Sequence, residues 1–249
     1  MVRRELRQKY KGSALGILWY FVNPLVLMGA YALVFSVLLK VSVGIEDYPL
    51  FLLVGLIVWV FFSQALLSAA PSIVQHASLV RKVRFPREAI PASSATVQLV
   101  TFLVMLALVT PVALVVRSSL DPALALLPLI VVLLFAMVLG LSLVVSVLHA
   151  HYRDVEPVLA AALLPWFFLT PIFLRVEDMP GVDEHPWVGD LLQWANPVAP
   201  FIEAVRDVLF LGATPSTATL LYLVGAGVGA LALGLIVFRR MERDLAVIV

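Results

Sequence analysis

Long apolar runs separated by short polar segments dominate the chain. Six of these runs approach or exceed the length of about 20 residues with which a helix crosses a bilayer. They cover residues 17–39, 49–67, 97–116, 123–148, 158–174 and 218–238. The pattern predicts an all-α integral membrane protein, with six transmembrane helices in one transmembrane domain over residues 1–249.

Composition supports the membrane class. Hydrophobic residues make up 62% of the chain and charged residues 13%, with a mean hydropathy of +1.05. Soluble domains contain about 45–50% apolar and about 25% charged residues. The net charge of +1 argues against nucleic acid as a partner, and the absence of cysteine excludes disulfides and thiolate metal sites.

The basic residues predict how the chain is oriented. With six spans, both termini and the loops at residues 68–92 and 149–157 share one side, which holds thirteen of the seventeen lysines and arginines. Cytoplasmic segments are enriched in these residues. We therefore predict a multi-pass protein of the inner (cytoplasmic) membrane with both termini in the cytoplasm.

Several function classes lack their signatures. The sequence has no G-x-x-x-x-G-K-[ST] loop, so we expect no cofactor in this chain and ATP hydrolysis by a partner. The apolar cores of the spans carry no Asp, Glu, Lys, Arg or His, which disfavours a secondary transporter or a channel with a charged ring. His149 and His151 are two positions apart and face different directions on a helix, so we predict no metal site.

Two cytoplasmic segments carry a basic pattern. Residues 1–16 are basic and partly amphipathic, which predicts a helix in the membrane interface, although a basic flank of the first span is the alternative. Residues 68–92 combine a short helical part, four cations and the turn at Phe85-Pro86. This pattern fits a docking element for a soluble partner and a simple basic loop equally well.

Three features surround the last two spans. Pro165 and Pro171 are expected to interrupt the fifth span. Residues 175–216 are rich in aromatic and apolar side chains, which predicts short re-entrant helices at the outer interface, with an ordinary extracellular loop as the alternative. The pair Gly225 and Gly229 forms a G-x-x-x-G motif, and Ala230 and Gly234 continue its face of small residues, which indicates close helix packing, within the chain or between chains.

Four segments together resemble the permease subunits of type-2 ABC exporters for O-antigen, teichoic acid and related cell-surface polysaccharides. They are RQKYKGSALGILWYFVNPL, VRKVRFPREAIP, HYRDVEPVL with FFLTPIF, and NPVAPFIEAVRDVLF, which occur in the family's order over nearly the whole chain. Family members usually have a longer segment before the RYKGS-like motif. About eight residues precede it here.

The resemblance implies a set of partners. These are a second copy of the chain, two copies of a separate ABC ATPase subunit that binds ATP and Mg, membrane lipids, and a polyprenyl-pyrophosphate-linked glycan moved outward. It also implies residue roles. The residues expected beside the lipid pyrophosphate are Arg7, Lys9, Tyr10 and Lys11; those expected to contact the ATPase are Val80, Arg81, Lys82, Val83, Arg84, Phe85, Arg153 and Asp154; those that could line the glycan path are Trp19, Tyr20, Phe61, Phe62, Trp166, Phe167 and Phe168.

Two other functions remain open from the sequence. A type-2 exporter for a drug or small lipid would share the fold. A membrane enzyme acting on polyprenyl phosphates would need carboxylates at a cytoplasmic site, and Asp154 with Glu156 is the nearest pair.

Overall fold

The computed structural model describes residues 47–82, 85–117, 121–179 and 184–242, together with isolated positions among 22–45 and at 182 and 245. The side chains of Arg81 and Lys82 are outside the description. The predicted interface helix at residues 1–16 and most of the predicted first span therefore lie outside the described residues.

Four helices of the described residues are long and apolar enough to cross a membrane. The helices of this set are α3 (Tyr48–Ala69), α6 (Ala89–Arg117), α7 (Leu127–His151, preceded by the 3₁₀ turn η3, Pro122–Leu126) and α11 (Thr217–Met241). They confirm the second, third, fourth and sixth predicted spans, and the described residues contain no β-strand. α6 begins eight residues earlier than predicted, because Pro91 is tolerated in the first turn of a helix.

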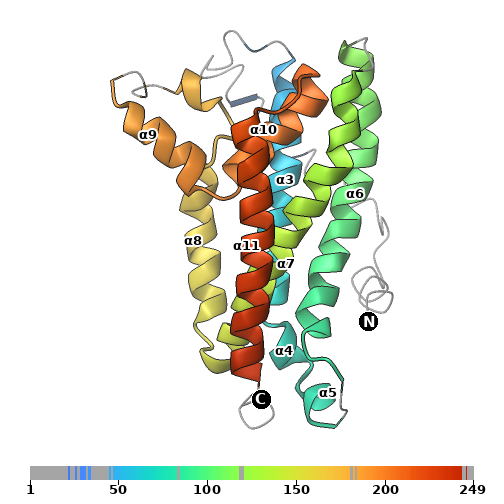
Figure 1. The fold of residues 1–249 in the computed structure, drawn as a ribbon, viewed down its shortest axis with the longest axis vertical. Helices are drawn as coiled ribbons and strands as arrows, with labels where there is room; N and C mark the ends of the chain where they lie inside the picture. Colours follow the sequence, from blue (N-terminus) through green and yellow to red (C-terminus); the bar gives the residue numbers. More distant parts are fainter. Residues whose placement is uncertain are drawn as a thin grey trace.

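The long helices stand side by side; α3, α7 and α11 run from the upper end in the view to the opposite end, and α6 runs the other way (Figure 1). α3 is the central helix, since 83% of its most apolar window is buried, against 17% for α11. α6 packs mainly on α3, and α7 packs mainly on α11. Arg117 at the end of α6 forms an ion pair with Asp121 across the short connection to η3.

Glycines bring α7 and α11 into backbone contact. A Cβ atom on Gly140 would collide with the carbonyl of Ala230, and one on Gly234 would collide with the carbonyl of Gly140. Small residues allow this approach between membrane helices. Gly225 and Gly229 of the predicted motif instead have no atom within 4 Å of an added Cβ among the described residues. The close packing thus uses Ala230 and Gly234, the second pair of the predicted small residues.

The fifth apolar segment forms a shorter helix than predicted. α8 (Val155–Leu169) has 15 residues, begins three residues before the predicted span and ends five residues before its end. Thr170 is extended, as expected for the residue before Pro171. Pro165 lies inside α8, so the prediction that it interrupts the segment is wrong. α8 falls below the length of the four candidate spans.

Short helices between α8 and α11 form a helical hairpin at one end of the bundle (Figure 1). The elements are η4 (Val176–Asp178), then a first limb of α9 (Pro186–Asp190) and the π-helix η5 (Leu191–Ala195), then a second limb of α10 (Ala199–Arg206) and the π-helix η6 (Asp207–Leu211). Gly212 ends the second limb at φ 67°, a left-handed conformation that favours glycine. We call this end of the bundle the hairpin end.

The opposite end carries α4 (Ser72–Gln75) and α5 (Ala77–Lys82), the α7–α8 turn and the end of α11, and we call it the loop end (Figure 1). A second apolar cluster holds these segments together, with Val80, Leu143 and Phe238 among its buried members. Arg87 also bonds the carbonyl of Glu242 beyond α11.

Candidate functional site

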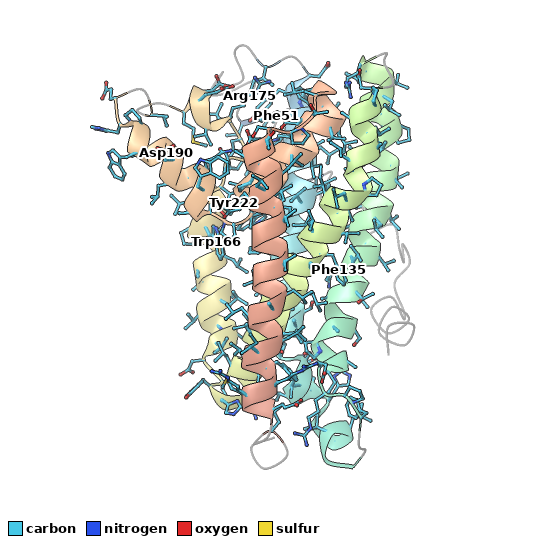
Figure 2. The ribbon with its side chains drawn as sticks, viewed as in Figure 1. Phe51, Phe135, Trp166, Arg175, Asp190 and Tyr222 are labelled. Carbon is cyan, nitrogen blue, oxygen red and sulfur yellow. The ribbon has the colours of Figure 1, made fainter. Side chains whose placement is uncertain are left out.

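A cavity of about 440 Å³ opens at the hairpin end, between the hairpin, the end of α8 and the start of α3. Its lining includes six charged residues, Arg175, Glu177, Asp190, Glu203, Arg206 and Asp207. Figure 2 shows Phe51 and Arg175 at this end, with Asp190 on the first limb. The charged lining distinguishes this region from the apolar bundle below it.

Arg206 connects the hairpin to the rest of the bundle through buried hydrogen bonds. It is 6% exposed, and its guanidinium donates to the carbonyls of Pro171 (2.6 Å), Ile172 (2.6 Å) and Phe51 (3.3 Å). The same group lies 3.6 Å from the centroid of the Phe51 ring, within the range of a cation–π interaction. Burial lowers the pKa of Arg206 to about 9, so it remains charged at neutral pH.

A glycine makes room for this arginine. An added Cβ on Gly55 would lie 2.5 Å from Nη2 of Arg206. The guanidinium thus joins the second limb of the hairpin to both α3 and the backbone that follows α8. The guanidinium of Arg206 is buried, and its N–H donors bond main-chain carbonyls. Arg206 therefore holds the hairpin to the bundle and has few donors left for a ligand.

Two carboxyl groups one helical turn apart face the same cavity. Burial raises the pKa of Glu203, whose carboxylate accepts a hydrogen bond from Gln193 of the first limb. Burial also raises the pKa of Asp207 to about 6, and the nearby Glu203 adds to this increase. Asp207 therefore titrates closer to neutral pH than an ordinary aspartate does.

Asn196 fixes the turn between the two limbs. Its Oδ1 accepts from Nε1 of Trp166 (3.0 Å) and from the backbone amide of Val198 (3.2 Å), and its Nδ2 donates to Oγ1 of Thr170 (2.9 Å). Tyr222 of α11 holds the first limb by donating to the carbonyl of Trp194 (2.9 Å). The hairpin is therefore bonded to α8, α3 and α11.

Aromatic rings fill the space between α3 and α8. Phe62 lies 5.2 Å from Trp166 and Trp59 lies 5.6 Å from Phe167, measured between ring centroids. Phe61, Phe62 and Phe167 are buried within the chain, whereas Phe168 is 58% exposed. Of the described candidates for the glycan path, Phe168 and the partly buried Trp166 therefore present a ring at the surface of the chain. The role itself stays a prediction.

The residues predicted to contact an ATPase gather at the loop end. Arg153 and Asp154 are exposed in the α7–α8 turn, next to Tyr152, which is 64% exposed. Val80 is 4% exposed and packs in the second cluster, so it anchors its segment, and Phe85 packs partly against the same cluster. Val83 and Arg84 lie outside the described residues, as do Arg7, Lys9, Tyr10, Lys11, Trp19 and Tyr20.

His149 at the loop end has a structural role. It is 5% exposed, and its Nδ1 accepts a hydrogen bond from the backbone amide of Glu156 (3.3 Å), in the first turn of α8. This contact satisfies one of the free amides at the helix start. Asp154 lies just before the first residue of α8, and Glu156 lies in its first turn. Within the described residues no group of three or more potential metal ligands occurs.

Sequence reasoning missed Arg206 and Asn196 as organising residues. Arg206 belongs to residues 175–216, for which the sequence predicts short re-entrant helices or an ordinary loop, and it stands in the apolar sequence AVRDVLF. An isolated cation in such a setting signals a buried, multiply bonded side chain. The partners of Asn196 lie 26 and 30 residues away in the sequence, so no local pattern revealed them.

Comparisons with known proteins agree on a transporter family. The profile of the family described as ABC-2 type transporter matches residues 1–210. The chain is 28% identical to the O-antigen export system permease protein RfbA of Myxococcus xanthus, over 92% of the chain and 85% of that protein. It is 27% identical to a Klebsiella pneumoniae protein of the same name, over 97% of the chain and 90% of that protein.

Proposed function

The chain belongs to the ABC-2 type transporter family, and on this premise we propose that it is the transmembrane permease subunit of an ATP-driven exporter for an O-antigen-type polysaccharide. The similarity to O-antigen export permeases carries this proposal, because it extends over 92% and 97% of the chain. The four candidate spans and the absence of a nucleotide-binding loop from the sequence fit a subunit that transports but does not hydrolyse ATP.

The proposal assigns the two ends of the bundle to the two sides of the inner membrane. The loop end faces the cytoplasm, which fits the positive charge of residues 81–87 and of Arg239 and Arg240 at the end of α11. The hairpin end then lies in the outer leaflet. Trp187 and Trp194, which are 66% and 37% exposed, suit the headgroup region there.

The loop end provides the contact to the ATPase in this proposal. The α4–α5 segment and the α7–α8 turn lie at the same end, although about 70 residues separate them. The exposed candidates are Arg153 and Asp154, whereas Val80 supports the segment from below. A rigid, packed segment suits this role because it can pass on a movement of the partner.

The substrate in this proposal is a polyprenyl-pyrophosphate-linked glycan. Arg7, Lys9, Tyr10 and Lys11 would bind the pyrophosphate through charge-assisted hydrogen bonds, and a second copy of the chain would complete the path. Exposed rings such as Phe168 would lie along the path, since sugars pack on aromatic faces.

Depletion of the chain in its host tests the proposal. Polyprenyl-pyrophosphate-linked glycans are quantified in the lipid extract by mass spectrometry, and the surface polymers are measured in parallel. We expect one glycan to accumulate and the matching surface polymer to disappear. Unchanged glycans and unchanged surface polymers would contradict the proposal and favour an exporter of a drug or small lipid.

A further inference from the structure

A second cavity, of about 480 Å³, lies near the loop end and differs in its chemistry from the first. Its lining residues come from α3, α4, α6 and the start of α8. Those with polar side chains are Gln64, Ser68, Gln75, His76, Ser94, Gln98 and Glu156. We call it the amide pocket, because three glutamines line it. None of its residues lines the hairpin-end cavity or belongs to the aromatic group between α3 and α8.

Two buried side chains of α6 face this pocket without a protein partner. Gln98 and Ser94 are each 7% exposed, and neither makes a side-chain hydrogen bond within the described residues. The hydroxyls of Ser93, Thr96 and Thr101 on the same helix instead bond back to helix carbonyls. Neither side chain is among those of the described residues whose polar atoms are fully buried without a partner, so the polar atoms of Gln98 and Ser94 are open to the pocket, where water or a ligand can bond them.

The remaining groups of the pocket offer further donors and acceptors. Gln64 and Gln75 are exposed and mark its mouth, whereas Gln98 and Ser94 lie at its floor. The Nδ1 of His76 lies 2.8 Å from the carbonyl of Ser72, so Nδ1 carries the proton and Nε2 is an acceptor in the neutral ring. The pocket therefore combines donors and acceptors in a small volume.

The charged side chains that line the amide pocket indicate which class of ligand it can bind. No lysine or arginine is among the lining residues that the structure describes, and the one carboxylate is Glu156. Among the residues that the structure describes, a pyrophosphate would therefore meet the carboxylate of Glu156 and no lysine or arginine. A lipid tail would leave the amides unsatisfied. A neutral polyhydroxylated ligand fits, because each sugar hydroxyl both donates and accepts and each amide does the same.

We propose that the amide pocket binds a sugar unit of the exported glycan near its lipid end, on the cytoplasmic side of the membrane. This inference rests on the proposed function. Gln98 and Ser94 would bond the sugar hydroxyls at the floor, with Gln64 and Gln75 at the mouth. Recognition of the glycan is thereby separate from recognition of the pyrophosphate, which belongs to cationic residues elsewhere in the chain.

The test compares two lipids on the full-length chain in lipid nanodiscs. One is a polyprenyl pyrophosphate that carries one glycan repeat unit from the host, and the other is the same lipid with its sugars removed. We expect the wild-type chain to bind the glycosylated lipid about tenfold more tightly, which corresponds to about two neutral hydrogen bonds. Gln98→Met and Ser94→Ala should each reduce this ratio about threefold, and the double variant should bring it close to one, while the affinity for the bare lipid stays unchanged.

Thr101→Val provides the matched control. Thr101 lies one turn further along α6, its hydroxyl bonds its own helix, and it does not line the pocket. This variant should keep the wild-type ratio. A ratio of one in the wild-type chain, or an unchanged ratio in a folded Gln98→Met variant, would overturn the inference alone. Failure of the wild-type chain to bind either lipid would overturn the proposed function together with it.

Discussion

Substitution of Arg206 by methionine should loosen the hairpin from the bundle. The change removes three hydrogen bonds from the guanidinium and its contact with the ring of Phe51. The three carbonyls differ in whether they keep another hydrogen-bond partner after the substitution. Phe51 lies inside α3, where its carbonyl accepts from the next turn, whereas those of Pro171 and Ile172 have no backbone partner within the described residues.

The expected size follows from these contacts. Two buried carbonyls without a partner cost about 1–3 kcal/mol each, and a buried cation–π contact contributes about 2 kcal/mol. Part of this loss of stability is offset, because the folded state of the variant no longer contains a desolvated guanidinium charge. We expect a net loss of about 3 kcal/mol. For a chain of this size that corresponds to a Tm lower by about 6–12 °C.

Thermal unfolding of the full-length chain in detergent measures the effect. Arg175→Met is the matched control, because Arg175 lines the same cavity but is more exposed and forms a surface ion pair with Glu177. Such a pair contributes about 0–1 kcal/mol. Gly55→Ala should reproduce part of the loss, since its Cβ would displace the guanidinium. If Arg206→Met lowers Tm no more than Arg175→Met does, the inference that Arg206 holds the hairpin to the bundle is refuted.

Two further predictions concern packing and pH. Gly140→Ala should destabilise the chain by about 1–3 kcal/mol, because its Cβ meets the backbone of α11, while Gly229→Ala should be neutral or slightly stabilising; equal Tm values would contradict the packing argument. Asp207 holds its proton more tightly when folded, so its contribution to stability should fall as pH rises from its ordinary pKa of 3.8 to about 6. Tm measured from pH 4 to 8 should show this fall in the wild-type chain and a smaller one in Asp207→Asn; identical profiles would exclude the effect.

The sequence predicted the long helices well because their signal is strong and local. The apolar run from Pro49 to Leu67 became α3, and the run before the C-terminus became α11, each with small changes at the ends. The N-terminus of α11 also follows a local rule, because the hydroxyl of Ser216 accepts from the amide of Thr219. Such signals depend only on neighbouring residues.

The length of α8 and the packing glycines depend on distant partners. Apolar residues continue beyond Leu169, but the backbone turns at Thr170 and Pro171 because Asn196 and Arg206 bond this segment from the hairpin. The G-x-x-x-G spacing correctly indicated close packing on α11. Of the small residues predicted to form this face, Ala230 and Gly234 contact the backbone of α7, whereas no described atom lies near Gly225 or Gly229.

The short α8 has a consequence for the barrier that a glycan meets. Its 15 residues span about 22 Å, less than the hydrocarbon thickness of about 30 Å. Polar backbone and charged side chains at the hairpin end take up the remaining depth. In the proposed exporter, the apolar layer along α8 would therefore be thinner than the surrounding bilayer. A hydrophilic polymer that passes beside α8 would then exchange water for protein over a shorter distance than it would across lipid.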